Sequence, residues 1–288
     1  MLLRCFAHMA GAGAKRIAII YTGKQVPWLD EVLYSAFNAT ESVGVQLVLR
    51  ASSSFSRKAL EKIALGVARN GIQGLLLVPP CAELLTGRSA LSHLNVAAIA
   101  TAGALPDMHT VRIDNRTATA RLTEYLIGLG HRRIAFIAGA PRHSDSKERR
   151  IGYERAMQES NLPVLQELIA DGEFTFESGC RAAERLLDLP DRPTAIVASN
   201  DEMAAGALSV AQQRGLKLPN DLSIVGFDDT PTATSTWPPL TVIRQPIAAM
   251  AARGVELLMG ARNSNVTAPS DVLLDHTLVE RASTAPCR

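Results

Sequence analysis

The chain has 288 residues, which exceeds one ordinary domain and suits two of moderate size. Hydrophobic residues make up 47% of it and aromatic residues only 5%, so we expect aliphatic cores of the α/β type. The formal net charge of +2, from 30 basic and 28 acidic residues, argues against a nucleic-acid surface spread over the whole chain. Any contact with DNA would have to be made by a small separate element.

Cysteine usage and hydropathy narrow the class of protein further. The cysteines form no C-x-x-C pair and lie at no metal spacing from a histidine, so they predict reduced structural thiols and no zinc site. No apolar run reaches transmembrane length, so we expect no membrane contact. The N-terminal stretch "MLLRCFAHMAGAGAKR" has an early arginine but a weak apolar centre. It therefore favours a cytoplasmic protein over a secreted one.

Apolar strand-like runs alternate with helical patterns in the first part of the chain. Strands are predicted at 16–21, 45–50, 74–79 and 96–101, and helices near 29–42, 56–70 and 82–92. The helix at 56–70 has Leu60, Ile63, Ala64 and Val67 at steps of three and four. This βαβ series predicts a parallel sheet covered by helices on both faces.

The alternation then repeats and ends in a different pattern. Strands are predicted at 133–139, 167–173, 194–200 and 222–229, and helices near 117–130, 148–160, 177–188 and 201–214. The segment 110–115 lies between the two series and is a candidate crossover. After residue 230 a Pro- and Thr-rich return crossing, a helix (247–259) and a strand (271–280) are too short for a third domain. They are expected to complete the edges of the first two units.

Polar or aromatic side chains follow several of the predicted strands. They are Thr22, Asp114, Phe174, Asn200 and Asp228. Doubly wound sheets bind ligands at the carboxyl ends of their strands. In a two-lobed protein these ends can face each other across a cleft, so the residues above are the first candidates for a binding site.

Six motifs follow one another in the second part of the chain. They are "GHRRIAFIAG" (130–139), "ERRIGYERAM" (148–157), "ASNDEMAAGAL" (198–208), "DLSIVGFDDT" (221–230), "PPLTVIRQP" (238–246) and "LVERAST" (278–284). Each is weak alone, but in this order and spacing they resemble the regulatory core of the LacI/GalR family of bacterial transcription regulators. The resemblance covers residues 15–285. It implies an α/β fold of two doubly wound parallel-sheet lobes joined by crossing strands, as in type I periplasmic binding proteins.

The resemblance also divides the chain. The N-terminal lobe would comprise 15–114 plus 244–272, the C-terminal lobe 115–243 plus 273–288, and residues 1–14 a hinge-helix remnant or a disordered leader. The stretch "MLLRCFA" (1–7) resembles the end of the family's hinge helix. Leu2 would then be the side chain that wedges into the DNA minor groove. Family members begin with a helix-turn-helix headpiece, so operator DNA would be contacted only through a headpiece absent from this chain.

Two charged residues are the leading ligand candidates. Arg149 lies in an R-x-x-G motif near a helix start, where the family's arginine holds ligand oxygens; its planar donors suit vicinal hydroxyls or a carboxylate. The alternative is a solvated helix face, since "SKERR" is a charge run. Asp228 follows an apolar strand, and family members accept ligand hydrogen bonds there. The alternative is an Asx-type turn.

The aromatic candidates are Trp28 and Phe174. An indole offers a flat apolar platform for a sugar face, although Trp28 is equally suited to core packing or a contact that closes the lobes. Phe174 matches an aromatic wall position of the resembling family. Asp114 lies at the lobe crossing, and a hinge turn is its alternative.

Asn200 can be interpreted in two ways. Local chemistry makes Ser199 or Asn200 the cap of the following helix, with Asp201 and Glu202 favouring the positive end of its dipole. The two-lobed geometry instead assigns the Asn200 amide to the ligand, because it can both donate and accept, and leaves capping to its neighbours. Further ligand candidates are Thr22, Gln25 and Gln245.

These features predict an effector-sensing core that binds a small polar metabolite, a sugar or sugar acid, and transmits lobe rotation to DNA. The family implies a homodimer. No nucleophile, phosphate-loop or dinucleotide motif is present, so we expect neither an enzyme nor a cofactor. The alternative is a periplasmic sugar-binding protein of a transporter, which would share the fold and the cleft.

Overall fold

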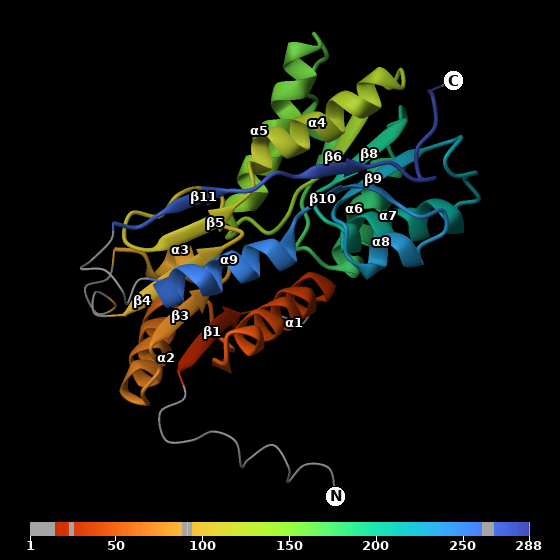
Figure 1. The fold of residues 1–288 in the computed structure, drawn as a ribbon. Coiled ribbons are helices and arrows are strands. Elements are labelled where there is room, and N and C mark those ends of the chain that lie inside the picture. Colours follow the sequence, from red (N-terminus) through yellow and green to blue (C-terminus); the bar gives the residue numbers. More distant parts are fainter. Residues whose placement is uncertain (1–14, 23–25, 88–90, 92–93, 261–267, 288) are drawn as a thin grey trace, which may run out of the picture. The chain divides into compact units, whose positions relative to one another are not determined.

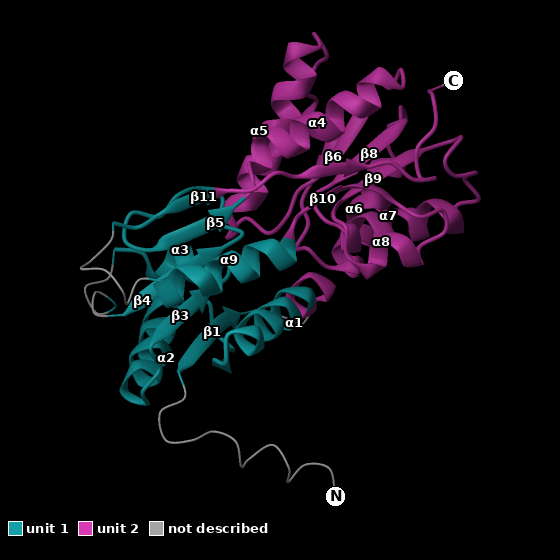
Figure 2. Ribbon diagram, in the orientation of Figure 1, with its two compact units in different colours: residues 1–24, 31–112, 247–272 teal, residues 25–30, 113–246, 273–288 magenta. Residues whose placement is uncertain are grey.

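The computed structural model describes residues 15–22, 26–87, 91, 94–260 and 268–287 (Figure 1). The chain forms two compact units (Figure 2). The first unit falls within residues 1–24, 31–112 and 247–272, and the second within 25–30, 113–246 and 273–288. Within the described residues, no helix is both long enough and apolar enough to span a bilayer.

The first unit is built on a six-stranded sheet with the order β11-β5-β4-β3-β1-β2. Its strands are β1 (Arg16–Thr22), β2 (Gln46–Ser52), β3 (Gly74–Leu77), β4 (Asn95–Ile99), β5 (His109–Arg112) and β11 (Asp271–Leu273). Its helices are α1 (Pro27–Ser42), which belongs to this unit from residue 31 onward, α2 (Arg57–Arg69), α3 (Cys81–Leu85) and α9 (Ile247–Gly260). The pairs from β2 to β5 are parallel, and fully buried β3 is continuously apolar, as a strand covered on both faces requires.

The second unit has the same build, with the sheet order β12-β10-β9-β8-β6-β7. Its strands are β6 (Ile134–Ile137), β7 (Ile169–Ala170), β8 (Ala195–Ala198), β9 (Ser223–Asp228), β10 (Thr241–Arg244) and β12 (Thr277–Val279). Its helices are α4 (Asn115–Gly128), α5 (Ser144–Glu159), α6 (Phe176–Leu187), α7 (Asp201–Gln213) and α8 (Pro231–Ser235). Among the described residues of this sheet, β12 pairs antiparallel with β10 while the other pairs are parallel, so the parallel strands end at one edge.

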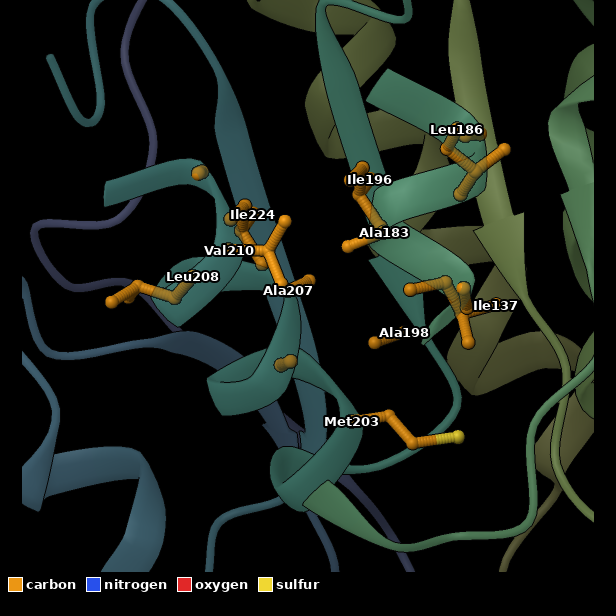
Figure 3. Packing of buried hydrophobic residues seen from close by; sticks show 14 of the residues in the cluster. Ile137, Ala183, Leu186, Ile196, Ala198, Met203, Ala207, Leu208, Val210 and Ile224 are labelled. Atoms are coloured by element: carbon orange, nitrogen blue, oxygen red, sulfur yellow. The ribbon is translucent and has the colours of Figure 1, made fainter. Parts of the chain in front are cut away.

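The core of the second unit fixes where α7 begins. Figure 3 shows Met203 and Ala207 of α7 in the same cluster as Ile196 on β8. Helices α6 and α7 approach closely because Gly179 and Gly206 have no side chains: a Cβ would lie 2.4 Å from the Met203 carbonyl oxygen and 2.3 Å from the Phe176 carbonyl oxygen, respectively. This packing holds the first turn of α7 at the carboxyl end of β8.

The predicted α/β alternation is confirmed, with corrections at several elements. The run 271–280 forms two strands, β11 and β12, which join different sheets. The segment 110–115 contributes to β5 rather than serving only as a crossover, and of the strand expected at 167–173 only β7 forms. The apolar pattern of each of these segments indicates a strand, whereas the pairing of the strand depends on which sheet edge is open to it.

The unit boundaries also differ from those expected from the sequence. Residues 113–114 and 244–246 belong to the second unit rather than the first, and so do residues 26–30, at the start of α1. At residues 114 and 244 the reason is a contact with an element of the second unit. Asp114 caps α4, and Arg244 ends β10, which pairs with β9 in the second sheet.

Candidate functional site

Arg149 reaches the strand ends of the second unit because α5 packs closely on α4. A Cβ on Gly152, one turn after Arg149, would lie 2.2 Å from the carbonyl oxygen of Arg116, so only glycine allows this approach. The side chain of Arg149 is buried, and its Nε donates to Oδ1 of Asn115 at 2.9 Å. The R-x-x-G spacing therefore combines a contact residue with the glycine that lets it enter. The alternative of a solvated helix face is wrong for Arg149.

The buried guanidinium of Arg149 is surrounded on several sides. It lies 3.8 Å from the centroid of the Phe227 ring, and its NH1 donates to the carbonyl oxygen of Ser199. Two carboxylates face it: Asp145 at 3.4 Å and Asp228 at 3.6 Å. Such pairing is what a charge needs when it is taken out of water.

Asp228 is the last residue of β9 and adopts an unusual backbone conformation. Its φ is 108° and that of Asp229 is 64°, both in the region that favours glycine. Oδ1 of Asp228 accepts from Nε2 of Gln245 at 2.6 Å. Asp229 is held by Arg244 and Arg281, each at 2.6 Å. The turn after β9 is thus fixed by ion pairs in a conformation that isolated residues avoid.

Asn200 is itself the cap of α7, which corrects the expectation that its neighbours would cap the helix. Its Oδ1 accepts from the backbone N–H of Met203 at 3.0 Å, and its Nδ2 donates to the carbonyl oxygen of Phe174 at 3.1 Å. Both faces of the amide therefore already have protein partners. A ligand role for Asn200 stays a prediction.

Phe174 stands beside this cluster in a left-handed conformation, with φ of 62°. Its ring occupies the place that a side chain at Gly139 would take, since a Cβ there would lie 2.0 Å from the ring. The ring meets His143 edge-on at 5.3 Å and lies 5.9 Å from the Arg149 guanidinium. Half-buried Phe174 therefore forms an apolar wall next to the charged groups.

His143 also lies in this cluster, although no motif or spacing in the sequence predicted it. Its Nδ1 lies 3.8 Å from Oδ1 of Asp145. Burial lowers the pKa of His143; Asp145 opposes this shift, while Arg142 and Arg149 add to it. A neutral imidazole can both donate and accept a hydrogen bond.

Asp201 lies at the start of α7, as the sequence predicted, but it also makes contacts that the sequence did not predict. It is 1% exposed and accepts from both the N–H and the hydroxyl of Thr230. Burial and the charge of Asp228 raise its pKa well above the usual value. Asn115 and Asp145 were not selected from the sequence; the one sequence feature they share with Asp201 is that each is a polar residue in the first turn of a helix.

The other predicted residues are placed as follows. Asp114 caps α4: its carboxylate accepts from the N–H of Thr117 at 3.0 Å and from the Thr117 hydroxyl at 2.7 Å, so it is a helix cap rather than a hinge turn. Thr22 ends β1 in the first unit, 3.9 Å from the Cys81 sulfur, and half-buried Trp28 lies in the first turn of α1. Leu2 and Gln25 lie outside the described residues.

The structure therefore brings together Arg149, Asp228 and Gln245 directly, with Phe174 and Asn200 beside them. The cluster offers charged and neutral hydrogen-bonding groups next to an aromatic wall, which suits a polar ligand with apolar faces. Within the described part of the chain, no group of three or more His, Cys, Asp and Glu side chains is arranged to hold a metal ion.

Comparison with known proteins defines the class first. A family model described as "Periplasmic binding protein-like domain" matches residues 123–284. Catabolite control protein A of Priestia megaterium is 40% identical over 176 residues, which are 61% of this chain and 53% of that protein. The transcriptional regulator DegA of Bacillus subtilis (strain 168) is 31% identical over 285 residues, covering 97% and 84%. The chain spans about half the length of the first of these relatives.

Solved structures agree with this class. A regulatory protein of the LacI family from Chloroflexus aggregans is 33% identical, with a TM-score of 0.81 and coverage of 93% and 98%. A complex of the transcriptional regulator CelR with cellobiose is 28% identical, with a TM-score of 0.83 and coverage of 94% and 85%. The chain belongs to the LacI family of transcriptional regulators. The alternative of a transporter's periplasmic sugar-binding protein is not favoured, because these relatives are named as regulators.

Proposed function

We propose that this chain is the effector-sensing core of a LacI-family regulator. It binds a small polar metabolite, a sugar or sugar acid, at the strand ends of the second unit. Operator DNA is contacted by a separate headpiece, and the regulator acts as a homodimer in the cytoplasm. It performs no chemistry on the effector.

The observation that carries this proposal is the buried pair of Arg149 and Asp228 at the ends of the strands. Buried charges cost desolvation and rarely stabilise a fold better than apolar residues of the same size. A charged cluster at the carboxyl edge of a doubly wound sheet is therefore best explained by a ligand that uses it. The strained backbone of Asp228 supports the same conclusion.

The charges around Arg149 bear on which effector to test first. Asp145 and Asp228 already face the guanidinium. An acidic effector would compete with these two carboxylates for one cation, whereas hydroxyl groups can accept from Arg149 and donate to Asp228 at once. Together with the cellobiose that one related regulator binds, this supports neutral sugars as the first probes.

Binding would control DNA affinity through the arrangement of the two units. An effector that makes better contacts in one arrangement than in another shifts the population toward the first. In a dimer, the resulting rotation of one unit moves the DNA-binding segments and changes operator affinity by a coupling free energy.

Isothermal titration with neutral sugars, sugar acids and purines tests the proposal. We expect a neutral sugar to bind, and Arg149→Lys or Asp228→Asn to weaken it by about tenfold or more, because each removes a charged hydrogen-bonding partner. Arg150→Lys is the matched control, since Arg150 pairs with Glu154 on the half-exposed side of α5, and it should leave the affinity unchanged. Purine binding without any sugar binding would show that the effector class is wrong.

A further inference from the structure

Asp201 links two separate parts of the candidate site. It is the first residue of α7 and is almost completely buried. Its Oδ2 accepts from the backbone N–H of Thr230 at 2.7 Å and from the Thr230 hydroxyl at 3.0 Å. Its Oδ1 is buried without a hydrogen-bond partner among the described residues. Burying a carboxyl group costs more free energy than its interaction with a helix dipole returns, so the burial of Asp201 indicates a further role.

The sequence of β9 makes room for this carboxyl group. A Cβ on Gly226 would lie 2.7 Å from Oδ1 of Asp201, closer than real Cβ contacts allow. The glycine of the "GFDD" motif therefore admits Asp201 against the strand. In consequence the start of α7 is tied to the turn that follows β9, two residues after Asp228.

That turn needs restraints, because Asp228 and Asp229 both have positive φ. Such a backbone persists only where its surroundings over-determine it. Arg244 and Arg281 hold the side chain of Asp229. Asp201 is the group that holds the next residue, Thr230, and it does so through the backbone N–H as well as the side chain.

We propose that Asp201 is a positioning residue of the effector site: by holding Thr230, it keeps Asp228 in the conformation that presents its carboxylate to Arg149 and to the effector. The effector part of this statement rests on the proposed function. The part that concerns the geometry of the turn does not.

The charges around Asp201 should make the conformation of the turn after β9 depend on pH. Burial and then the charge of Asp228 raise its pKa, the two bonds from Thr230 lower it, and Asp229 adds a further rise. The cations in this region face the other two acids, Arg149 at Asp228 and Arg244 and Arg281 at Asp229. When the pH rises through the raised pKa, Asp201 gains a charge beside Asp228, and repulsion between them should distort the turn.

The test compares Asp201→Ala and Asp201→Asn with Glu202→Gln. The last is a matched control, because it also removes an acid from the first turn of α7, while its partner is Thr232 rather than Thr230. Crystal structures without effector report the φ of Asp228 and the contact with Arg149. Titration with cellobiose and the other neutral sugars, from about pH 6 to about pH 9, reports affinity and its pH profile.

In Asp201→Ala we expect Asp228 to leave its positive φ, the contact with Arg149 to open, and sugar affinity to fall by about tenfold. Asp201→Asn should restore both, since its amide oxygen can accept from Thr230. It should also remove the loss of affinity that we expect of the wild type as the pH rises. Glu202→Gln should behave as the wild type.

Two outcomes distinguish a failure of the proposed effector class from a failure of the positioning role of Asp201. If no sugar binds the wild type, the proposed effector class fails, while the crystal structures still decide the positioning role. If the turn and the Arg149 contact are unchanged in Asp201→Ala, the positioning role is wrong, whatever binds. An alanine variant that does not fold shifts the decision to Asp201→Asn, where a pH profile identical to that of the wild type would equally overturn the proposal.

Discussion

The two units share one build but differ in what they bury at their strand ends. Each has a six-stranded sheet with corresponding strand order and an aliphatic core. The second unit has four buried charged residues, Asp145, Arg149, Asp201 and Asp228, and the side chain of Asp229 is only 5% exposed. Among the described residues of the first unit, no Asp, Glu, Lys or Arg is buried, and the buried polar side chains are Ser, Thr and one His. Both units thus share the fold, and the buried charged groups are a property of the second unit alone among the described residues.

The difference also concerns how polar groups are satisfied. In the first unit, buried Thr40 donates to the carbonyl oxygen of Ala36 in its own helix, at 2.9 Å. In the second, the partners of Arg149 lie in α4, in α5, in β9 and at Ser199, directly after β8. A local bond forms with the helix itself, whereas the cluster around Arg149 exists only when all these elements are in place. Removing a member should therefore have very different effects in the two units.

The largest difference in the free energy of unfolding is expected between the variants Arg149→Met and Arg112→Met. Loss of Arg149 leaves Asp145 and Asp228 facing each other without a buried cation and should lower the free energy of unfolding by about 3–5 kcal/mol. Arg112, in the first unit, donates two hydrogen bonds to Asp271, at 2.9 and 2.7 Å, but the two side chains are 20% and 34% exposed, so its loss should cost only about 1 kcal/mol. Urea denaturation followed by circular dichroism measures both.

The double variant Arg149→Met with Asp228→Asn provides the control for that comparison. It removes the charge of one of the two carboxylates that face Arg149, so it should recover part of the stability that Arg149→Met loses. Equal losses at Arg149 and Arg112 would show that the buried cluster is no more demanding than a surface ion pair, and would remove the contrast between the units.

A smaller difference is expected between two helix caps, Asn200→Ala and Ser56→Ala. Asn200 caps α7 and also holds the Phe174 carbonyl oxygen, so its loss should lower the free energy of unfolding by about 1–2 kcal/mol. Ser56 precedes α2 in the first unit but makes no side-chain cap bond, so its loss should be close to neutral. The same denaturation experiment decides, and Asn200→Asp, which keeps an accepting oxygen, should retain the cap.

The sequence predicted the parts of this picture that depend on local patterns. Aliphatic runs and helical spacing located most strands and helices, because burial on one or both faces leaves a periodic trace. The rule that ligands bind at strand ends, with the family motifs, selected Arg149 and Asp228, which the structure places 3.6 Å apart.

What the sequence did not predict depends on contacts between distant elements. Asp201 fits a helix-start rule, and nothing nearby indicates that Gly226 leaves a space for it or that Thr230 bonds to it from 29 residues away. The capping role of Asn200 was assigned to its neighbours because its side chain was reserved for a ligand. The positive φ values of Phe174, Asp228 and Asp229 were not predicted, because glycine is the residue type that most clearly indicates this backbone conformation.

The smallest difference concerns two buried histidines, one in each unit. Burial lowers the pKa of both His109 and His131, with a partly opposing effect at His131 from the Ala285 carbonyl oxygen. Their stability contribution is therefore fully present above the unfolded pKa of about 6.5 and declines as the pH falls below it, because the unfolded chain takes up protons that the folded units bind less well.

The hydrogen-bond partners of these histidines predict which of the two loses more stability when it is protonated. Nδ1 of His109 accepts from the backbone N–H of Ser270 at 3.0 Å, so a proton on that nitrogen breaks the bond. Nδ1 of His131 instead meets the hydroxyl of Thr194 at 3.0 Å, which can turn to accept from a protonated ring. We therefore expect His109→Gln to reduce the acid sensitivity of unfolding more than His131→Gln. Ring-proton NMR titration checks the premise: either histidine titrating above about 6.5 would contradict it.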